Sequence, residues 1–168
     1  MKNLIVLVFL LSFFYGHTQK SKLSAEHYQN VRKSFRQKMP DHSVAVLFSA
    51  PIRNRANDVD YIYHQDPNFF YLTGWHQPHS VLIIYKDAQT DGSVVYYDKI
   101  YVPERNDYME MWNGKRYDLE EVKELGFDRV AERVDFKSDS QTLDHFDKVM
   151  MFEFKSDIRN QTPYIYKD

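Results

Sequence analysis

The carboxylates Asp58 and Asp60 are the residues whose types and spacing come nearest to an acid–base pair in this chain. Two positions apart on an extended segment, their side chains would point to the same side of the backbone and could exchange protons with a bound molecule. The sequence places no recognisable base or nucleophile opposite them, and its five glycines form no phosphate-binding loop. The pair therefore predicts no reaction on its own.

A second candidate for chemistry is the pair His76 and His79, three residues apart. On a helix this spacing could aim both rings at one metal ion, but Pro78 between them is incompatible with a helix interior. The chain has no cysteine, and no carboxylate stands at a ligand spacing from the two histidines. We therefore expect a solvated turn at residues 76–79 and no metal site in this chain.

Aromatic side chains are concentrated in residues 53–75, of which six are Tyr, Phe or Trp. They alternate with polar residues, a mixture typical of a half-buried segment that packs one side on the core and presents the other. Asp66 and Pro67 predict a turn, and Gly74 predicts its close. We expect Tyr71 to pack in the core, so that its replacement by Ala would destabilise the fold by about 2–4 kcal/mol.

The same segment carries sequence motifs of a known family. The first motif comprises Asn57, Asp58, Tyr61, Tyr63, Gln65, Asp66, Pro67, Phe69 and the string Tyr-Leu-Thr-Gly at residues 71–74. A second, Glu-Met-Trp-Asn-Gly-Lys-Arg, occupies residues 110–116, and a third, Leu-Gly-Phe-Asp-Arg, occupies residues 125–129. Together they resemble the N-terminal domain of Xaa-Pro aminopeptidases (aminopeptidase P), a domain type shared with prolidase and creatinase, over roughly residues 24–155. His64 and Ile62 stand where members of that family usually carry Arg and Pro.

The resemblance implies a domain that does not itself catalyse. In Xaa-Pro aminopeptidases a C-terminal domain of pita-bread fold binds two metal ions, commonly manganese, through Asp, His and Glu ligands downstream of a segment like this one. We therefore expect this chain to bind no cofactor, and we expect manganese in a full-length exported enzyme that removes the N-terminal residue preceding proline. The implied partners are the chain's own C-terminal catalytic domain, further copies in a homo-oligomer, and proline-containing peptides.

In that family the N-terminal domain shapes the active-site entrance and the oligomer. By motif position, Asp58 is expected to meet the ammonium end of a substrate, and Trp112 to pack on a side chain near the scissile bond. Asp58 could instead cap a turn after Asn57, and Trp112 could be an aromatic residue of the core or of a subunit interface. A function of another class also stays open, that of a free-standing binding or oligomerisation module without activity.

Charge and composition limit the remaining classes. The chain has 168 residues, a formal net charge of −2 and an isoelectric point near 6.4, so it has no electrostatic reason to bind nucleic acid. Lys2, followed by an almost wholly apolar stretch at residues 4–14, indicates a signal peptide over residues 1–18 that is too short to span a bilayer. We expect an exported protein, periplasmic or extracellular, whose residues 19–168 form one domain without a membrane span.

The elements that must position these residues follow from the apolar pattern. A helix is expected from Ser24, a good N-cap, to Pro40, with Tyr28, Val31 and Phe35 facing the core. In this interpretation its basic residues face solvent: Arg32, Lys33, Arg36 and Lys38. Residues 43–49 form a continuous apolar run, typical of a strand covered on both faces.

Later segments predict the rest of an α/β domain. Residues 81–85 and 94–97 are expected to form a hairpin with a polar loop at 87–92. Helices are expected at 107–112 and 118–125, strands at 129–134 and 148–152, and a further helix from residue 138 or 139 to 146. A hairpin followed by strand–helix–strand predicts a mixed sheet with flanking helices. The resemblance implies that this α/β fold is ribonuclease H-like, of the creatinase N-terminal domain type.

Overall fold

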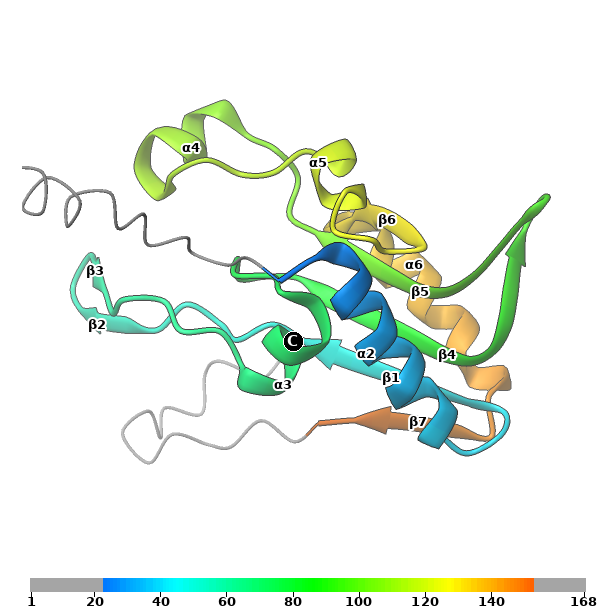
Figure 1. The fold of residues 1–168 in the computed structure, drawn as a ribbon. Coiled ribbons are helices and arrows are strands. Elements are labelled where there is room, and N and C mark those ends of the chain that lie inside the picture. Colours follow the sequence, from blue (N-terminus) through cyan, green and yellow to red (C-terminus); the bar gives the residue numbers. More distant parts are fainter. Residues whose placement is uncertain (1–22, 153–168) are drawn as a thin grey trace, which may run out of the picture.

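Five strands rich in β-branched and aromatic residues form a mixed central sheet in the computed structural model, which describes residues 23–152 (Figure 1). Their order across the sheet is β6-β5-β4-β1-β7. Their bounds are β1 (Ser43–Phe48), β4 (Val81–Asp91), β5 (Val94–Val102), β6 (Arg129–Glu132) and β7 (Lys148–Met151). The predicted strands are thus all present, and the mixed α/β class is confirmed.

The central three strands are antiparallel, and each outer strand is parallel to its neighbour. β4 pairs antiparallel with β1 and with β5, whereas β7 runs parallel to β1 and β6 runs parallel to β5. The hairpin of β4 and β5 is longer than predicted, because pairing continues to Asp91 opposite Val94 across a register shift after Ile84. The expected loop at 87–92 is therefore mostly strand, since polar residues can pair their backbones where neither face needs to be buried.

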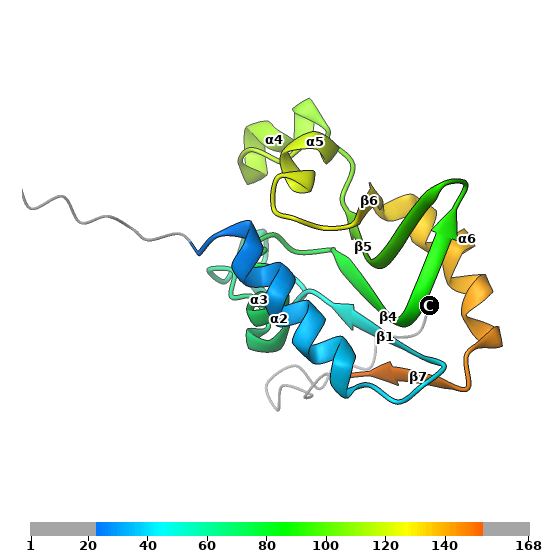
Figure 2. The same ribbon diagram turned by 45° about the vertical axis from the view of Figure 1, so that its right-hand side comes forward.

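One face of the sheet is covered by α2 (Ala25–Lys38), α3 (Pro67–Thr73) and α5 (Leu119–Lys123) (Figures 1 and 2). Ser24 caps α2 as predicted, accepting a hydrogen bond from the backbone N–H of His27. Val31 and Phe35 of α2 pack against a core that includes Leu47, Ile84 and Val122. Arg32 departs from the prediction: it is buried rather than solvated, with 2% of its surface exposed.

The opposite face is covered by a less regular segment than the predicted single helix. η2 (Arg133–Asp135), α6 (Phe136–Asp139) and η3 (Ser140–His145) follow one another along it. Phe136 meets the ring of Tyr101 on β5 at 5.3 Å between centroids, and Leu143 is buried beside it. Asp139 accepts hydrogen bonds from Lys99 Nζ at 2.5 Å and from the Tyr101 hydroxyl at 2.8 Å, which ties the segment to β5.

The aromatic segment at 53–75 is pinned to the core through α3, although not through the residue we expected. Asp66 caps α3 and Pro67 occupies its first turn, so the predicted turn is the start of a helix. Phe69 is fully buried, whereas Tyr71 is 63% exposed. The expectation for Tyr71 is wrong because helical periodicity places residues 69 and 72 on the core side and turns residue 71 outward.

Gly74 ends α3 in the left-handed conformation, with φ of 66°. A Cβ atom there would lie 2.5 Å from the ring of Tyr28 on α2. We expect Gly74→Ala to lower the free energy of unfolding by about 2–4 kcal/mol, from backbone strain together with this clash. Chemical denaturation would measure the loss.

Gly92→Ala is the matched control for that substitution. Gly92 has a similar φ of 60°, and a Cβ atom there would meet nothing within 4 Å. It should cost only the backbone strain, about 1 kcal/mol. Equal losses at both positions would show that the contact between α3 and α2 is not close.

The predicted signal peptide at residues 1–18 lies outside the described residues. Among residues 23–152, no helix combines the length and apolar character needed to cross a bilayer.

Candidate functional site

Most of the chain's irregular segments leave the sheet at one end. Because β1, β5, β6 and β7 run in the same direction and β4 runs opposite to them, four strands finish where β4 begins. We call this the carboxyl end of the sheet. Residues 49–80 and 103–118 both connect there, and the chain passes out of β7 there as well. In Figure 1 it lies opposite the long β4–β5 hairpin.

Asp58 lies at the tip of a small hairpin at this end, formed by β2 (Asn54–Ala56) and β3 (Val59–Asp60). The Asn54 amide braces the turn by donating to the carbonyl of Asn57 at 2.9 Å, and Asn57 adopts a left-handed conformation with φ of 52°. Asp58 itself is exposed and accepts no hydrogen bond from the described residues. The hairpin therefore presents the Asp58 carboxylate to solvent instead of using it as the predicted alternative, a turn cap.

Trp112 lies on α4 (Asp107–Asn113), in the second segment at the carboxyl end. Its side chain is 75% exposed, so it is not a residue of the core, one of the alternatives that the sequence left open. Met111 beside it is equally exposed. A large apolar patch that a domain leaves uncovered is typical of a surface that meets another molecule.

The segment that carries Trp112 is held by its own polar contacts. Arg105 pairs with Glu110 at 3.1 Å, and Arg116 donates to the carbonyl of Glu104 at 2.9 Å. Asp58 and Trp112 thus sit on separate segments at the same end of the sheet. The two segments are joined where the Gln77 amide donates to the Lys115 carbonyl at 2.9 Å and where the rings of Trp75 and Tyr117 lie 5.4 Å apart between centroids.

A groove of about 500 Å³ adjoins the β2–β3 hairpin. Its lining combines arginine, tyrosine and histidine side chains with a short apolar wall: Ala50, Pro51, Arg53, Arg55, Asp60, Tyr61, Ile62, Tyr63 and His64. The Tyr63 hydroxyl donates to the carbonyl of Ala50 at 3.1 Å, and burial raises the pKa of Tyr63 to about 12. The Tyr63 hydroxyl is thus neutral at physiological pH, and it forms a hydrogen-bonding part of the groove lining.

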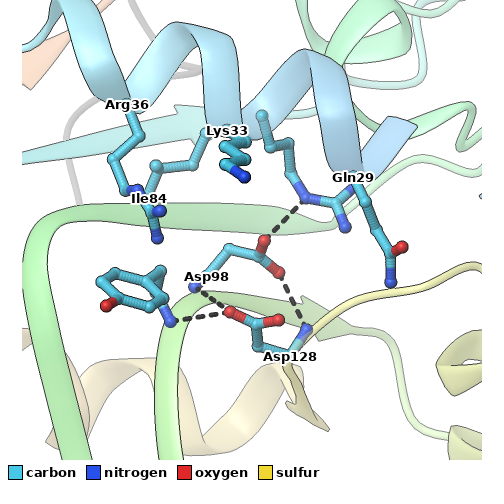
Figure 3. A pocket seen from close by; sticks show the side chains of 8 residues that line it. Gln29, Lys33, Arg36, Ile84, Asp98 and Asp128 are labelled. Carbon is cyan, nitrogen blue, oxygen red and sulfur yellow. Dashed lines mark hydrogen bonds and ion pairs between the residues drawn. The ribbon is translucent and has the colours of Figure 1, made fainter. Parts of the chain in front are cut away.

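A buried polar cluster beneath α2 forms the wall of a second, smaller cavity of about 230 Å³ (Figure 3). Arg32 Nε donates to Asp98 at 2.8 Å, and its other nitrogens donate to the carbonyls of Leu72 and Gly126. The second oxygen of Asp98 accepts from the backbone N–H of Asp128 at 3.0 Å. The cluster joins α2 and α3 to β5 and the start of β6, so its role is to hold the fold together.

His76 and His79 have different surroundings. The His76 ring contacts the Phe70 ring at 4.4 Å between centroids in a tilted arrangement, while burial and the nearby Arg116 and Arg133 lower the pKa of His79. Among residues 23–152, no three His, Asp or Glu side chains come close enough to hold an ion.

Comparison with known proteins gives consistent matches. The family described as "Aminopeptidase P, N-terminal domain" matches residues 28–150. The chain is 32% identical to the Xaa-Pro aminopeptidase of Escherichia coli over 111 residues, which cover 66% of this chain and 24% of that protein. It is 38% identical to intermediate cleaving peptidase 55 of Schizosaccharomyces pombe over 95 residues, 56% of this chain and 19% of that protein.

Solved structures show the same likeness. Aminopeptidase PepP of Pseudomonas aeruginosa superposes with a TM-score of 0.69 at 26% identity, over 80% of this chain and 30% of that one. Aminopeptidase P from E. coli with the inhibitor Pro-Leu superposes with a TM-score of 0.70 at 26% identity, over 81% of this chain and 30% of that one. The matched part of this chain spans a fifth to a quarter of the length of the curated relatives.

Proposed function

The chain belongs to the family of aminopeptidase P N-terminal domains, and on that premise we propose that it forms the non-catalytic domain of an Xaa-Pro aminopeptidase. In this role the carboxyl end of the sheet faces the catalytic domain that follows and helps to wall the entrance to its active site. The substrates are peptides with proline in second position, and the enzyme removes the residue before that proline.

The observation that supports this role is the convergence of three features at one end of the sheet. Asp58 at the hairpin tip, the exposed Trp112 of α4 and the exit of the chain from β7 all lie there. The chain thus leaves β7 at the same end of the sheet as the two side chains that the motifs single out, which supports a following domain at that end.

Within this role Asp58 receives the ammonium group of a substrate, and Trp112 packs on a substrate side chain near the scissile bond. An exposed carboxylate can form a charge-assisted hydrogen bond with a cation that binds beside it. An exposed indole is stabilised when a substrate side chain covers its apolar surface. Because both side chains are exposed, the same surface can also meet a neighbouring subunit in a homo-oligomer.

Metal chemistry belongs in this proposal to the downstream domain, where two ions, commonly manganese in the family, activate the attacking water. The residues described here offer no ligand set for them. We also propose export through residues 1–18, supported by Lys2 and the apolar stretch at 4–14. A ribonuclease H-like arrangement is supported by the antiparallel trio β5-β4-β1, with β7 added in parallel beside β1.

A chimeric enzyme tests the proposed function. Residues 24–152 of this chain would replace the matching segment of the E. coli Xaa-Pro aminopeptidase, and cleavage of an Xaa-Pro peptide would be measured. We expect an active chimera whose kcat/KM falls about tenfold with Asp58→Ala and with Trp112→Ala, the effect of losing about 1.4 kcal/mol of interaction.

Two further variants control the experiment. Val95→Ala removes an exposed side chain at the opposite end of the sheet and should leave kcat/KM unchanged. Trp112→Phe should retain most of the activity, because an aromatic face remains. A folded chimera without activity, or one indifferent to both Asp58→Ala and Trp112→Ala, would contradict the proposed role.

A further inference from the structure

The groove beside the β2–β3 hairpin has the size and mixed lining of a small-ligand site. Its volume of about 500 Å³ lies within the range of about 300–1,000 Å³ that such sites span. Its two arms are tied together where the Tyr61 N–H donates to the Arg53 carbonyl at 2.9 Å and where Tyr63 donates to Ala50. One backbone hydrogen bond and one side-chain hydrogen bond thus connect the two arms of the groove.

The polar side chains that line the groove differ in whether they already have interaction partners. Arg55 and His64 make no hydrogen bond, ion pair or ring contact with any residue from 23 to 152. Asp60, the acidic side chain of the lining, already accepts a hydrogen bond from the Asn54 amide at 3.3 Å. The Arg53 guanidinium lies 5.7 Å from the ring centroid of Tyr61 and adds a second positive charge. The groove thus carries an excess of positive charge, with an unengaged guanidinium.

The walls suit a peptide. Ile62 is almost wholly exposed, and Tyr61 is half exposed beside it. An apolar group of a ligand that packs on either side chain would remove apolar surface from water, which is favourable. Residues 61–64 line the groove and belong to no helix or strand, so backbone groups beyond the bonded Tyr61 N–H can pair with an extended peptide. A guanidinium binds a carboxylate through two parallel hydrogen bonds. The combination fits a peptide segment that ends in, or bears, a carboxylate.

We propose that this groove binds a carboxylate of a short peptide, with Arg55 as the principal cation and Tyr61 and Ile62 packing on the neighbouring residue. The proposal rests on the proposed function, since it assigns the far end of the peptide substrate to the same end of the sheet. The carboxylate is either that of the peptide's C-terminus or that of an acidic side chain. Peptides blocked at the C-terminus would then bind less tightly than free ones.

The purified chain and three synthetic peptides test this. The probes are Ala-Pro-Ala with a free C-terminus, the same peptide as its amide, and Ala-Pro-Glu amide, each titrated at low ionic strength and followed by NMR. We expect saturable binding of the free peptide and about fivefold weaker binding of Ala-Pro-Ala amide, the loss of a charge-assisted contact worth about 1 kcal/mol. Recovery of affinity with Ala-Pro-Glu amide would assign the site to acidic side chains, and no recovery would assign it to the C-terminus.

Variants of the chain locate the binding. Arg55→Gln should weaken the free peptide about fivefold and abolish its preference over the amide, whereas Arg55→Lys should retain part of that preference. Lys33→Gln removes the same charge from an exposed position on α2 that forms no ion pair within the described part of the chain, and it should change neither value.

Equal binding of free and amidated peptides, no saturable binding, or a loss with Lys33→Gln as large as with Arg55→Gln would overturn the proposal. The readout is binding to this chain, so it is independent of the chimera. An active chimera that depends on Trp112, together with a groove indifferent to carboxylates, would remove this inference and leave the proposed function standing.

Discussion

Replacing Arg32 by methionine is expected to lower the free energy of unfolding by about 3–5 kcal/mol, the cost of breaking a buried ion pair by removing one partner. The guanidinium donates to Asp98 and to the carbonyls of Leu72 and Gly126, and its Cζ atom lies 4.4 Å from the centroid of the Phe127 ring. Methionine can fill much of the volume but supplies none of the donors. Urea denaturation followed by circular dichroism would measure the loss.

This loss should depend on pH, because the variant leaves Asp98 without its cation. In the native chain burial raises the pKa of Asp98, and Arg32 offsets part of that rise. Without Arg32 the folded-state pKa lies further above the unfolded value, so the folded variant binds a proton more tightly than the unfolded chain. Its stability is therefore greatest below the ordinary aspartate pKa of about 3.9 and falls as pH rises through the folded-state pKa.

Lys33→Met is the matched control, since Lys33 is the exposed neighbour of Arg32 on α2. It should change the stability by no more than about 0.5 kcal/mol. If Arg32→Met cost no more than this control, or cost the same at acidic and neutral pH, the cluster would not be the charged bridge described above.

Phe69→Ala is expected to cost about 3–5 kcal/mol, the usual loss when a large buried aromatic side chain is removed and the site cannot collapse. Phe69 has no exposed surface and belongs to the core cluster that includes Leu72, Leu47 and Ile100. The measurement is the same denaturation experiment, with the denaturant slope checked for constancy so that the loss reports stability rather than a changed unfolded state.

Tyr71→Ala provides the internal comparison on the same helix. Tyr71 lies two residues along α3 and faces solvent, so we expect a change of no more than about 0.5 kcal/mol. Similar losses at positions 69 and 71 would mean that α3 packs in another orientation.

The regular elements were predictable because each rests on local signals. The caps at Ser24 and Asp118 and the apolar run of β1 can be recognised within a few residues of sequence, and the structure has all three. Arg32 was not predictable in this way. Its partner Asp98 is 66 residues away, and a basic residue on an amphipathic helix is ordinarily a solvated one.

In the candidate site, too, the features with local sequence signals were predictable and those that depend on the folded structure were not. Asp58 and Trp112 were identified from motifs, and the structure places both on exposed segments at one end of the sheet. The groove could not be read from the sequence, since Arg55 and His64 face the same space only once Asn54 and Asp60 pair across the hairpin. The unusually long, polar continuation of β4 was missed for a related reason, because backbone pairing there needs no apolar pattern.

The position of β1 between β4 and β7 has a consequence for how the chain folds. β1 is among the first strands to be synthesised, yet one of its two edges is completed only by β7, the last described strand. Pairing between such distant segments carries a high loop-closure cost and forms late. During synthesis one edge of the apolar β1 therefore has no strand to pair with until β7 is made. Nascent chains that stop before residue 148 expose this unpaired edge, which favours aggregation with other chains.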